Sequence, residues 1–353
     1  MSSALDRAAP PREGEGLDTQ KLSAFLSEHA GLDGPIEVGQ FPKGHSNLTY
    51  LLKVGDRELV LRRPPFGSKV KTAHDMGREH RILSALHGHY PAPRPIAMCD
   101  DESVLGAKFY VMERISGVIL RKDFPPGATP SPDEVRRIHT SLVDRLAELH
   151  AVDVVKVGLG DLGKPEGYVE RQVSGWTKRY EGSQTDDIAV VTDVAKYLAA
   201  NLPKESGAAL IHNDFKLDNV VLDPDDLGRV IGVLDWEMST LGDPLMDLGT
   251  SVGYWLEAGD DAAMQMIRWA PTTVPGSLTR REVIDRYEAQ TGRAVVNPVY
   301  YYAFGLWKTA VVLQQIYYRY KHGLTKDERF APLIFAVKVL CDQAARAIET
   351  GRV

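Results

Sequence analysis

HNDFKLDN, at residues 212–219, is the most informative segment of this 353-residue sequence. An apolar strand is expected directly before it, and the apolar run 220–222 predicts another strand directly after it. A further apolar run, 230–234, ends just before Asp235. The segment therefore predicts a loop of the form H-x-D-x-x-x-x-N between two strands, followed by an aspartate at the end of a third strand.

Phosphoryl transfer from ATP explains this set of side chains. Asp214 could accept the proton of an attacking hydroxyl group, and His212 would brace the loop through hydrogen bonds. Asn219 and Asp235 could supply the hard oxygen atoms that Mg²⁺ prefers. Such chemistry needs positioning and neutralisation of charge more than covalent catalysis. The alternative is that these residues only form turns at strand ends, but the ordered set of four favours the catalytic interpretation.

A glycine-containing loop, GQFPKGHSN at residues 39–47, lies between two expected strands. Gly44, His45 and Ser46 could bring backbone N–H groups to phosphates. The loop also imitates the P-loop pattern G-x-x-x-x-G-K-[ST], but His45 stands where that pattern requires lysine. A P-loop needs a helix next, whereas residues 48–54 predict a strand, so the P-loop interpretation is rejected.

The strand expected around residues 59–63 carries a cation that could reach the α- and β-phosphates. Alternation along the strand places Val60 and Arg62 on one face. Glu79 on the next expected helix is the natural ion-pair partner of Arg62, and Arg63 is a rival for the phosphate-binding role. A solvated surface charge would be the simpler explanation for Arg62 and Glu79, but the HNDFKLDN loop downstream favours a role for the pair in phosphate binding.

The rest of the pattern predicts a small β-dominated part followed by a larger helical part. Residues 1–16 predict a frayed tail, and a connector is expected near residues 113–117. Strands are expected at residues 36–41, 48–54, 58–63, 109–114, 209–213, 220–222 and 230–234. Helices are expected at residues 17–29, 75–87, 132–150, 186–201, 281–291, 299–321 and 330–349. The predicted lobes are therefore residues 17–115 and residues 116–353.

Composition excludes several classes of protein. Hydrophobic residues make up 43% and charged residues 25% of the chain, which is typical of globular proteins. The net charge of −6 gives no overall basic field for nucleic acid. Only two cysteines occur, so neither a disulfide framework nor a cysteine-based zinc site is expected. No apolar stretch has the length of a membrane span, and a cytoplasmic location is the default expectation.

In this order the segments resemble the protein-kinase-like fold, and in detail its aminoglycoside phosphotransferase and choline kinase branch. HNDFKLDN, LDWE (234–237) and GDPLMDL (242–248) carry the resemblance, which spans about residues 38–253. It implies an α+β, two-lobe protein with a small antiparallel-sheet N-terminal lobe that binds ATP and Mg²⁺. It also implies that backbone groups around Glu113 and Ile115 hold the adenine. The larger, mainly helical C-terminal lobe would bind the acceptor.

A narrower resemblance concerns the kinase-like domain fused to, or encoded beside, acyl-CoA dehydrogenase family members ten and eleven. The similar segments are GHSNLTY (44–50), LRRPP (61–65), FYVMERISG (109–117) and LDWEMSTLGDPLMDL (234–248). The resemblance implies a hydroxyacyl-CoA or related acyl metabolite as the small-molecule acceptor, with an acyl-CoA dehydrogenase as a partner. A kinase-like fold would occupy this chain and leave no room for a flavin domain, so flavin chemistry would belong to a neighbour.

The sequence departs from the protein-kinase pattern in two places. Arg62 replaces the usual lysine of the third strand and binds phosphate as a planar fork. Asp235-Trp236-Glu237 replaces the DFG sequence, and no A-P-E segment follows, which speaks against a protein substrate. Glu237 is either an additional group near the metal or a surface glutamate.

The sequence says less about the acceptor than about the nucleotide. Residues 244–353 carry 13 Lys or Arg and 11 Asp or Glu, so their balance is +2 against −8 for the rest of the chain. An acidic pocket for a cationic aminoglycoside or choline is therefore not evident, although a kinase of that type stays an alternative. The basic segment 319–322 could meet the phosphates of coenzyme A or could simply end a helix in water. A third alternative is a nucleotide-binding pseudokinase that assists an acyl-CoA dehydrogenase.

Overall fold

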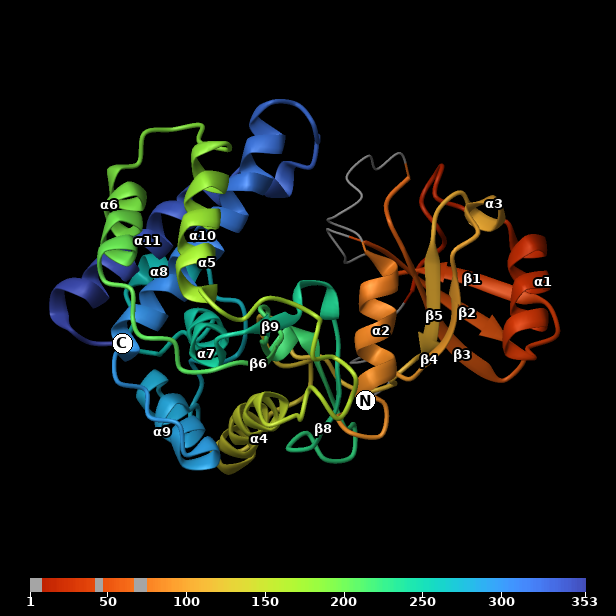
Figure 1. Cartoon of the computed structure of the whole chain (residues 1–353), viewed down its shortest axis with the longest axis horizontal. Coiled ribbons are helices and arrows are strands. Elements are labelled where there is room, and N and C mark those ends of the chain that lie inside the picture. The colour runs from red at the N-terminus through yellow and green to blue at the C-terminus, as the bar shows by residue number, and fades with distance from the viewer. Residues whose placement is uncertain (1–7, 42–46, 67–74) are drawn as a thin grey trace. The chain divides into compact units, whose positions relative to one another are not determined.

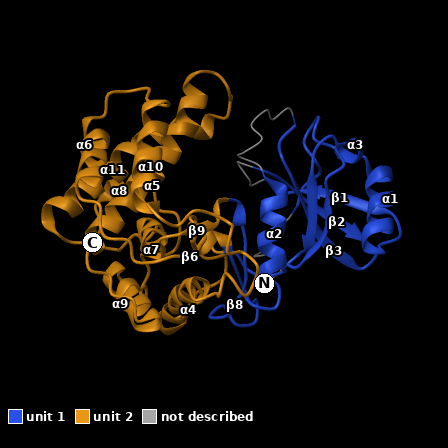
Figure 2. Cartoon of the chain, viewed as in Figure 1, with its two compact units in different colours: residues 1–119, 220–237 blue, residues 120–219, 238–353 orange. Residues whose placement is uncertain are grey.

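The computed structural model describes residues 8–41, 47–66 and 75–353, and the chain divides into two compact units (Figure 1, Figure 2). Unit 1 comprises residues 1–119 and 220–237, and unit 2 comprises residues 120–219 and 238–353. The predicted lobes place residues 220–237 in the larger part, whereas in the structure they pack with unit 1. One reason is an antiparallel bridge between Val118 and Leu222.

Unit 1 is built on a five-stranded antiparallel sheet with the order β1-β2-β3-β5-β4. A tight turn at Gly55, whose φ of 58° suits glycine, joins β2 to β3. The strand at residues 95–99 is not predicted, because the proline residues beside it hide its pattern. The strands are β1 (Ile36–Gln40), β2 (Leu48–Val54), β3 (Arg57–Arg63), β4 (Pro95–Cys99) and β5 (Phe109–Glu113).

Helix α1 (Thr19–Ala30) closes one hydrophobic core of unit 1. Its N-cap is Asp18, whose side chain accepts the backbone N–H of Lys21. Leu22, Phe25 and Leu26 recur at helical spacing and join one buried cluster with residues of the sheet. Unit 1 also contains α2 (Met76–Leu86), the short α3 (Glu102–Leu105) and the hairpin of β7 (Val220–Leu222) and β8 (Val230–Val233).

Part of the predicted tail is held against the sheet. Ala9 pairs with Gln40 of β1 through two backbone hydrogen bonds, and the Tyr50 hydroxyl donates to the carbonyl of Glu15. Gln40 also accepts the backbone N–H of Arg12 and donates to the Glu15 carboxylate, so polar contacts with partners distant in sequence hold this segment.

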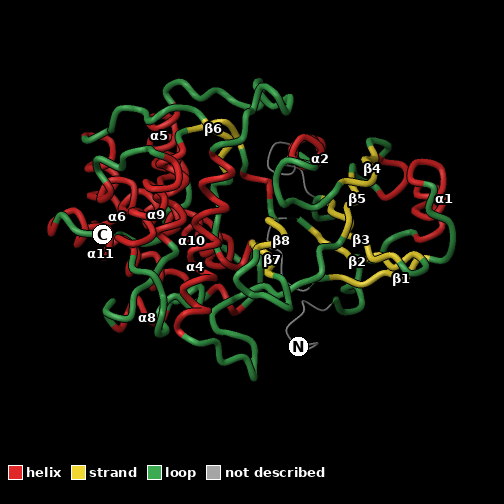
Figure 3. The backbone as a smooth tube through the Cα atoms, turned by 90° about the horizontal axis from the view of Figure 1, so that it is seen from below, coloured by secondary structure: helices red, strands yellow, loops and turns green. Residues whose placement is uncertain are grey.

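Unit 2 is mainly helical, as the tube in Figure 3 shows. Its two-stranded sheet pairs β6 (Ala209–Ile211) with β9 (Thr240–Gly242). The sequence did not predict α5, α7, α8 or β9. The helices are α4 (Pro132–His150), α5 (Tyr168–Glu181), α6 (Ala189–Ala200), α7 (Pro244–Gly253), α8 (Ala262–Met266), α9 (Arg280–Thr291), α10 (Pro298–Lys321) and α11 (Leu333–Thr350). No helix in the described ranges is long and apolar enough to cross a membrane.

Candidate functional site

Unit 2 presents the carboxylate of Asp214 at the start of the HNDFKLDN loop, and three side chains hold it. The Tyr254 hydroxyl donates to Oδ1 at 2.8 Å, and the Asn219 amide nitrogen donates to Oδ2 at 2.9 Å. The Lys216 ammonium lies 3.0 Å from Oδ2. These contacts fix the orientation of the carboxylate while 18% of the side chain stays exposed. The arrangement suits a proton acceptor with one open side.

The residue before Asp214 adopts a strained backbone conformation. Asn213 has a φ of 66°, in the left-handed region that few residues other than glycine adopt. Its side chain accepts from the Tyr168 hydroxyl at 3.0 Å and donates to the Met238 carbonyl at 3.0 Å. Its own carbonyl accepts from the Lys308 ammonium at 2.6 Å. Contacts on both sides of the backbone therefore stabilise the turn that presents Asp214.

Asp247, in the middle of α7, binds the backbone of the same loop. It is fully buried, and its two oxygens accept the backbone N–H groups of His212 and Asn213, both at 2.7 Å. His150 Nε2 lies 3.1 Å from the same carboxylate. Burial acts to raise the pKa of Asp247, but the bonds from His150 and the charge beside it hold that pKa below its ordinary value. The charged form of Asp247 is therefore the form that binds the loop.

His212, for which the sequence predicts a bracing role, contacts the loop from within the core. Its ring is fully buried, and Nδ1 accepts the backbone N–H of Asp214 at 3.3 Å. The ring also meets Phe215 edge to face at 5.7 Å. These contacts suit a positioning role for His212.

Lys308 is a functional candidate that the sequence reasoning missed. It comes from the middle of α10, where its side chain is only 3% exposed and lies 5.8 Å from the Trp176 ring centre. Burial lowers the pKa of Lys308 to about 8, against the opposing charges of Asp247 and Asp214. A lysine within an aromatic helical run, YYYAFGLWK at residues 300–308, was the signal that could have found it.

Unit 1 gathers a second polar cluster around Arg62 of β3. The guanidinium donates to Glu79 at 2.7 Å, to Asp235 at 3.1 Å and to Glu237 at 3.3 Å. Burial acts to lower the pKa of Arg62, but these carboxylates hold it well above its ordinary value. The Asn47 amide also donates to Glu237 at 2.8 Å. One buried cation thus connects α2 with the segment that follows β8.

The neighbouring arginine points elsewhere, because successive side chains of a strand face opposite sides. Arg63 donates to the carbonyls of Leu105 and Pro64 and stacks on the Phe66 ring at 3.7 Å. Arg62 and Arg63 therefore lie on opposite faces of the sheet, and of these two arginines it is Arg62 that forms an ion pair with Asp235.

The remaining predicted nucleotide-binding residues fall into two groups. Gly44, His45 and Ser46 lie outside the described residues. Val60 is buried in the sheet opposite Met112. The backbone N–H of Glu113 already donates to the Arg94 carbonyl, and the Ile115 side chain packs against Gly232. The carbonyl of Glu113 and the backbone of Ile115 are the groups that could form hydrogen bonds with the adenine of a nucleotide.

The oxygen atoms of the predicted metal ligands suit a Mg²⁺ ion whose other ligands are phosphate oxygens and water molecules. No group of three or more His, Cys, Asp and Glu side chains that could hold a metal occurs within residues 8–41, 47–66 and 75–353. Asp235 and Glu237 offer two carboxylates, and Mg²⁺ is usually held by one or two carboxylates plus substrate phosphates. The amide nitrogen of Asn219 is engaged by Asp214, so its oxygen is the atom a metal would use.

Comparison with protein families and curated proteins adds independent information. The family model described as "Phosphotransferase enzyme family" matches residues 37–278. Acyl-CoA dehydrogenase family member 10 of Mus musculus is 36% identical over 301 residues, covering 84% of this chain and 28% of that protein. Acyl-CoA dehydrogenase family member 11 of Homo sapiens is 35% identical over 332 residues, covering 88% and 40%. The chain thus spans less than half the length of these relatives.

Solved structures show the same fold. A Ralstonia eutropha JMP134 protein that carries the provisional name aminoglycoside phosphotransferase is 32% identical, with a TM-score of 0.81 over 95% of this chain and 99% of that one. Aminoglycoside phosphotransferase APH(4)-Ia, solved with AMP-PNP and hygromycin B, is 16% identical with a TM-score of 0.58, over 93% and 98%. Choline kinase of Cryptosporidium parvum Iowa II is 12% identical with a TM-score of 0.60, over 95% and 97%. The expected α+β, kinase-like fold is therefore confirmed.

Proposed function

Because the chain belongs to the phosphotransferase enzyme family, we propose that it transfers the γ-phosphoryl group of ATP to a hydroxyl group of a small molecule. The observation that carries this proposal is the Asp214 carboxylate, which Tyr254, Asn219 and Lys216 hold in one orientation. A family member that had lost the reaction would have no need for such a set. The pseudokinase alternative is correspondingly less favoured.

In the proposed reaction, Asp214 accepts the proton as the hydroxyl oxygen attacks the γ-phosphorus atom. The bond between the γ-phosphorus and the bridging oxygen then breaks, and ADP leaves. Lys216 lies beside Asp214 and adds positive charge where the transferred group gains negative charge. Asp247 and Lys308 keep the loop in place through the backbone of His212 and Asn213.

The cluster of unit 1 would hold the nucleotide. Arg62 would bind the α- and β-phosphates as a planar fork, with Glu79 keeping the guanidinium in position. Asp235 and Asn219 would hold Mg²⁺, with Glu237 as an additional carboxylate. The ion would neutralise charge on the phosphates when bound. Glu113 and Ile115 would meet the adenine through their backbone, and Gly44, His45 and Ser46 would add N–H groups at the phosphates.

For the acceptor, a hydroxyacyl-CoA or related acyl metabolite is our first candidate. The names of the relatives, acyl-CoA dehydrogenase family members 10 and 11, support this choice. An acyl-CoA dehydrogenase is proposed as the partner for the same reason. Phosphorylation would convert the hydroxyl into a better leaving group for a following elimination.

The test measures ADP release with Mg²⁺ and ATP in the presence of 3- and 4-hydroxyacyl-CoAs, choline, kanamycin or no acceptor. We expect a hydroxyacyl-CoA to stimulate release, and Asp214→Asn to lower kcat by roughly 10²–10⁴ while nucleotide binding is retained. Asp193→Asn, an exposed position on α6, is the matched control.

Each outcome is informative. Stimulation by choline or kanamycin alone would move the chain to the resistance or choline branch. Nucleotide affinity that collapsed together with turnover in Asp214→Asn would count against the role of Asp214 as base. Binding of MgATP without turnover on any acceptor would overturn the proposed reaction and favour the pseudokinase.

A further inference from the structure

Unit 2 contains a pocket directly beside the HNDFKLDN loop. The space between its walls, counted together with the open solvent at its mouth, is about 470 Å³. Its walls come from α4, residues 215–218, the end of α7, residues 269–272 and α9. Most of the lining is apolar and includes Leu142, Leu146, Phe215, Trp255, Ala270 and Val283.

Two residues of the pocket wall also contact the Asp214 carboxylate. Tyr254 lines the pocket and donates its hydroxyl to Oδ1, and Lys216 lines the pocket with its ammonium 3.0 Å from Oδ2. The Lys216 ammonium lies 4.7 Å from the Tyr254 ring centre, so the two side chains form one boundary. A molecule in the pocket would therefore lie next to the side chains that orient the proposed base.

The charge of the lining does not suit a cationic ligand. Only Lys216 and Asp218 are charged among the lining residues, and their side chains lie 3.8 Å from each other. An aminoglycoside or choline would have to leave water without a carboxylate dedicated to it. An uncharged apolar group gains free energy in the same place.

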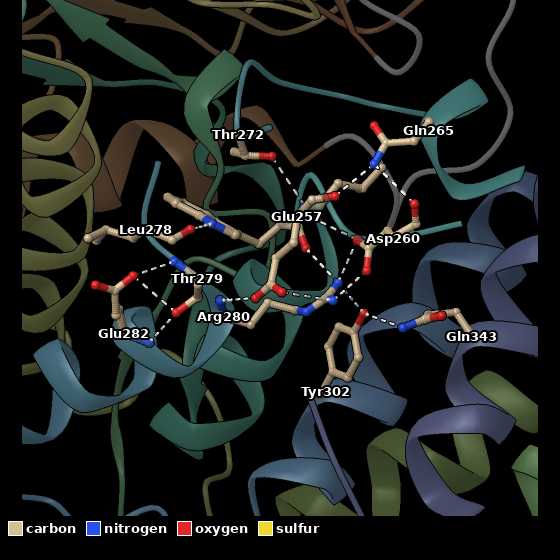
Figure 4. A network of polar contacts seen from close by, with 12 residues as sticks. Glu257, Asp260, Gln265, Thr272, Leu278, Thr279, Arg280, Glu282, Tyr302 and Gln343 are labelled. Carbon is tan, nitrogen blue, oxygen red and sulfur yellow. Dashed lines mark hydrogen bonds and ion pairs between the residues drawn. The ribbon is translucent and has the colours of Figure 1, made fainter. Parts of the chain in front are cut away.

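A network around Arg280 orders one part of the pocket wall (Figure 4). The buried guanidinium of Arg280 forms an ion pair with both oxygens of Asp260 and donates to the Tyr302 hydroxyl at 2.9 Å. It also donates to the Trp255 carbonyl at 3.3 Å, and Thr272 accepts the backbone N–H of Leu256 at 3.2 Å. These contacts fix the segments that carry Trp255 and Thr272, which lowers the entropic cost of binding at that part of the wall.

We propose that this pocket binds an uncharged, largely apolar chain attached to the hydroxyl-bearing carbon of the acceptor. The inference rests on the proposed function for the position of the hydroxyl group, but not for the pocket itself. It makes chain length, rather than positive charge, the property by which the protein selects its acceptor.

The test titrates a series of 2-alkanols with four to nine carbons into protein labelled with 5-fluorotryptophan. Fluorine NMR resolves the five tryptophans, of which Trp255 and Trp269 line the pocket. We expect shifts at these two residues, with affinity rising roughly fourfold per added methylene until the pocket is full. Affinity that does not depend on chain length in the unaltered protein would overturn the proposal.

Variants test the location. Ala270→Leu fills the pocket and should weaken binding at least tenfold, whereas Ala258→Leu, an exposed position on the same connecting segment, should leave it unchanged. Equal binding in Ala270→Leu and Ala258→Leu would contradict the assignment.

ADP release with the same alkanols separates this inference from the proposed function. Chain-length-dependent binding without phosphorylation of any acceptor would support the pocket and overturn the reaction. Phosphorylation with a KM that ignores chain length would support the reaction and overturn the pocket.

Discussion

At the scale of the residue, one strained turn explains why several buried polar groups surround Asp214. Asn213 has to adopt the left-handed conformation so that Asp214 faces away from the strand before it. Such a conformation costs on the order of 1–3 kcal/mol and persists only where the surroundings enforce it. Asp247 stabilises this conformation by accepting the Asn213 N–H, and Lys308 stabilises it by donating to the Asn213 carbonyl.

Lys308 makes a prediction about pH. Replacing it in Lys308→Met removes a charged donor, so we expect kcat to fall about tenfold or more, with little change in the KM for ATP. In the unaltered protein kcat should decrease as the pH rises through about 8, because the ammonium loses its proton there. The groups that face it are Asp247, Asp214, Lys216 and Arg179. The pH profile of Lys308→Met should lack this alkaline decrease.

The stability of the folded protein should change with pH in the direction opposite to that of kcat. The pKa of Lys308 lies below its unfolded value of 10.5, so between pH 8 and 10.5 the unfolded chain binds the extra proton and stability rises with pH. The free energy of unfolding measured in urea should therefore rise with pH across that window for the unaltered protein, relative to Lys308→Met. Lys338→Met, exposed on α11, is the control that should show neither effect. An alkaline decrease in kcat that persists in Lys308→Met would contradict the assignment.

At the scale of the element, two glycines let α7 and α10 approach closely. A Cβ atom on Gly305 would come within 2.0 Å of the Gly249 carbonyl, and one on Gly249 within 2.3 Å of the Tyr301 carbonyl. Neither contact can be relieved by a side chain, because both partners are backbone atoms. The close approach brings Asp247 of α7 and Lys308 of α10 to the same loop.

Gly305→Ala should therefore lower the free energy of unfolding by about 1–3 kcal/mol, the usual cost of overpacking. Activity should fall more than stability alone explains, because the two helices hold opposite sides of the Asn213 backbone. Gly259→Ala is the matched control, since nothing lies within 4 Å of its added Cβ. Chemical denaturation together with kcat at a temperature where both variants are folded checks the prediction. Equal stability of the two variants would argue against the close helix contact.

Helix prediction succeeded or failed for a physical reason. Helix α4 matches its predicted bounds because it begins with Ser131 as N-cap, has proline at its first position and buries one face. Helix α7 was missed because it is buried on almost every side, so its sequence shows no polar face to mark a period of 3.6. Helix α5 lacks a side-chain cap and contains Gly175, which weakens the local signal.

At the scale of the whole molecule, each compact unit carries one of the two polar clusters. Unit 1 gathers Arg62, Glu79 and Asp235, which come from distant parts of the sequence. Unit 2 gathers Asp214, Asn219, Asp247 and Lys308. The hairpin of β7 and β8 follows the HNDFKLDN loop in sequence but packs with unit 1, so the chain passes from unit 2 to unit 1 after residue 219 and back after residue 237.

Nucleotide binding should stabilise the molecule as a whole. A ligand at 100 times its Kd adds about 2.7 kcal/mol to the folded state, which should raise Tm by a few degrees. We expect AMP-PNP to do so with Mg²⁺ present and much less without it. Asp235→Ala should remove the Mg²⁺ dependence, whereas the exposed Asp225→Ala in the same hairpin should keep it. The same Mg²⁺ dependence in both variants would refute the metal-binding role of Asp235.

The order of chemistry-bearing residues along the chain was enough to predict the fold class, whereas the roles of the site residues stay predictions. Asp214 and Asn219 could be proposed together because they and the strands around them lie within one short segment. Alternation in β3 placed Val60 and Arg62 on one face but left Arg63 as a rival for the phosphate-binding role. Glu79 was expected on the next helix as the ion-pair partner of Arg62, and the two side chains form an ion pair in the structure.

Only the tertiary structure revealed the groups that support the loop. Asp247, Lys308, Tyr254 and His150 lie far from Asp214 in sequence, and no local pattern connects them with it. The pocket walls also come from separate helices whose apolar residues look like ordinary core in the sequence. Burial and charge pairing depend on which surfaces meet, and that depends on packing between segments rather than on the propensities within them.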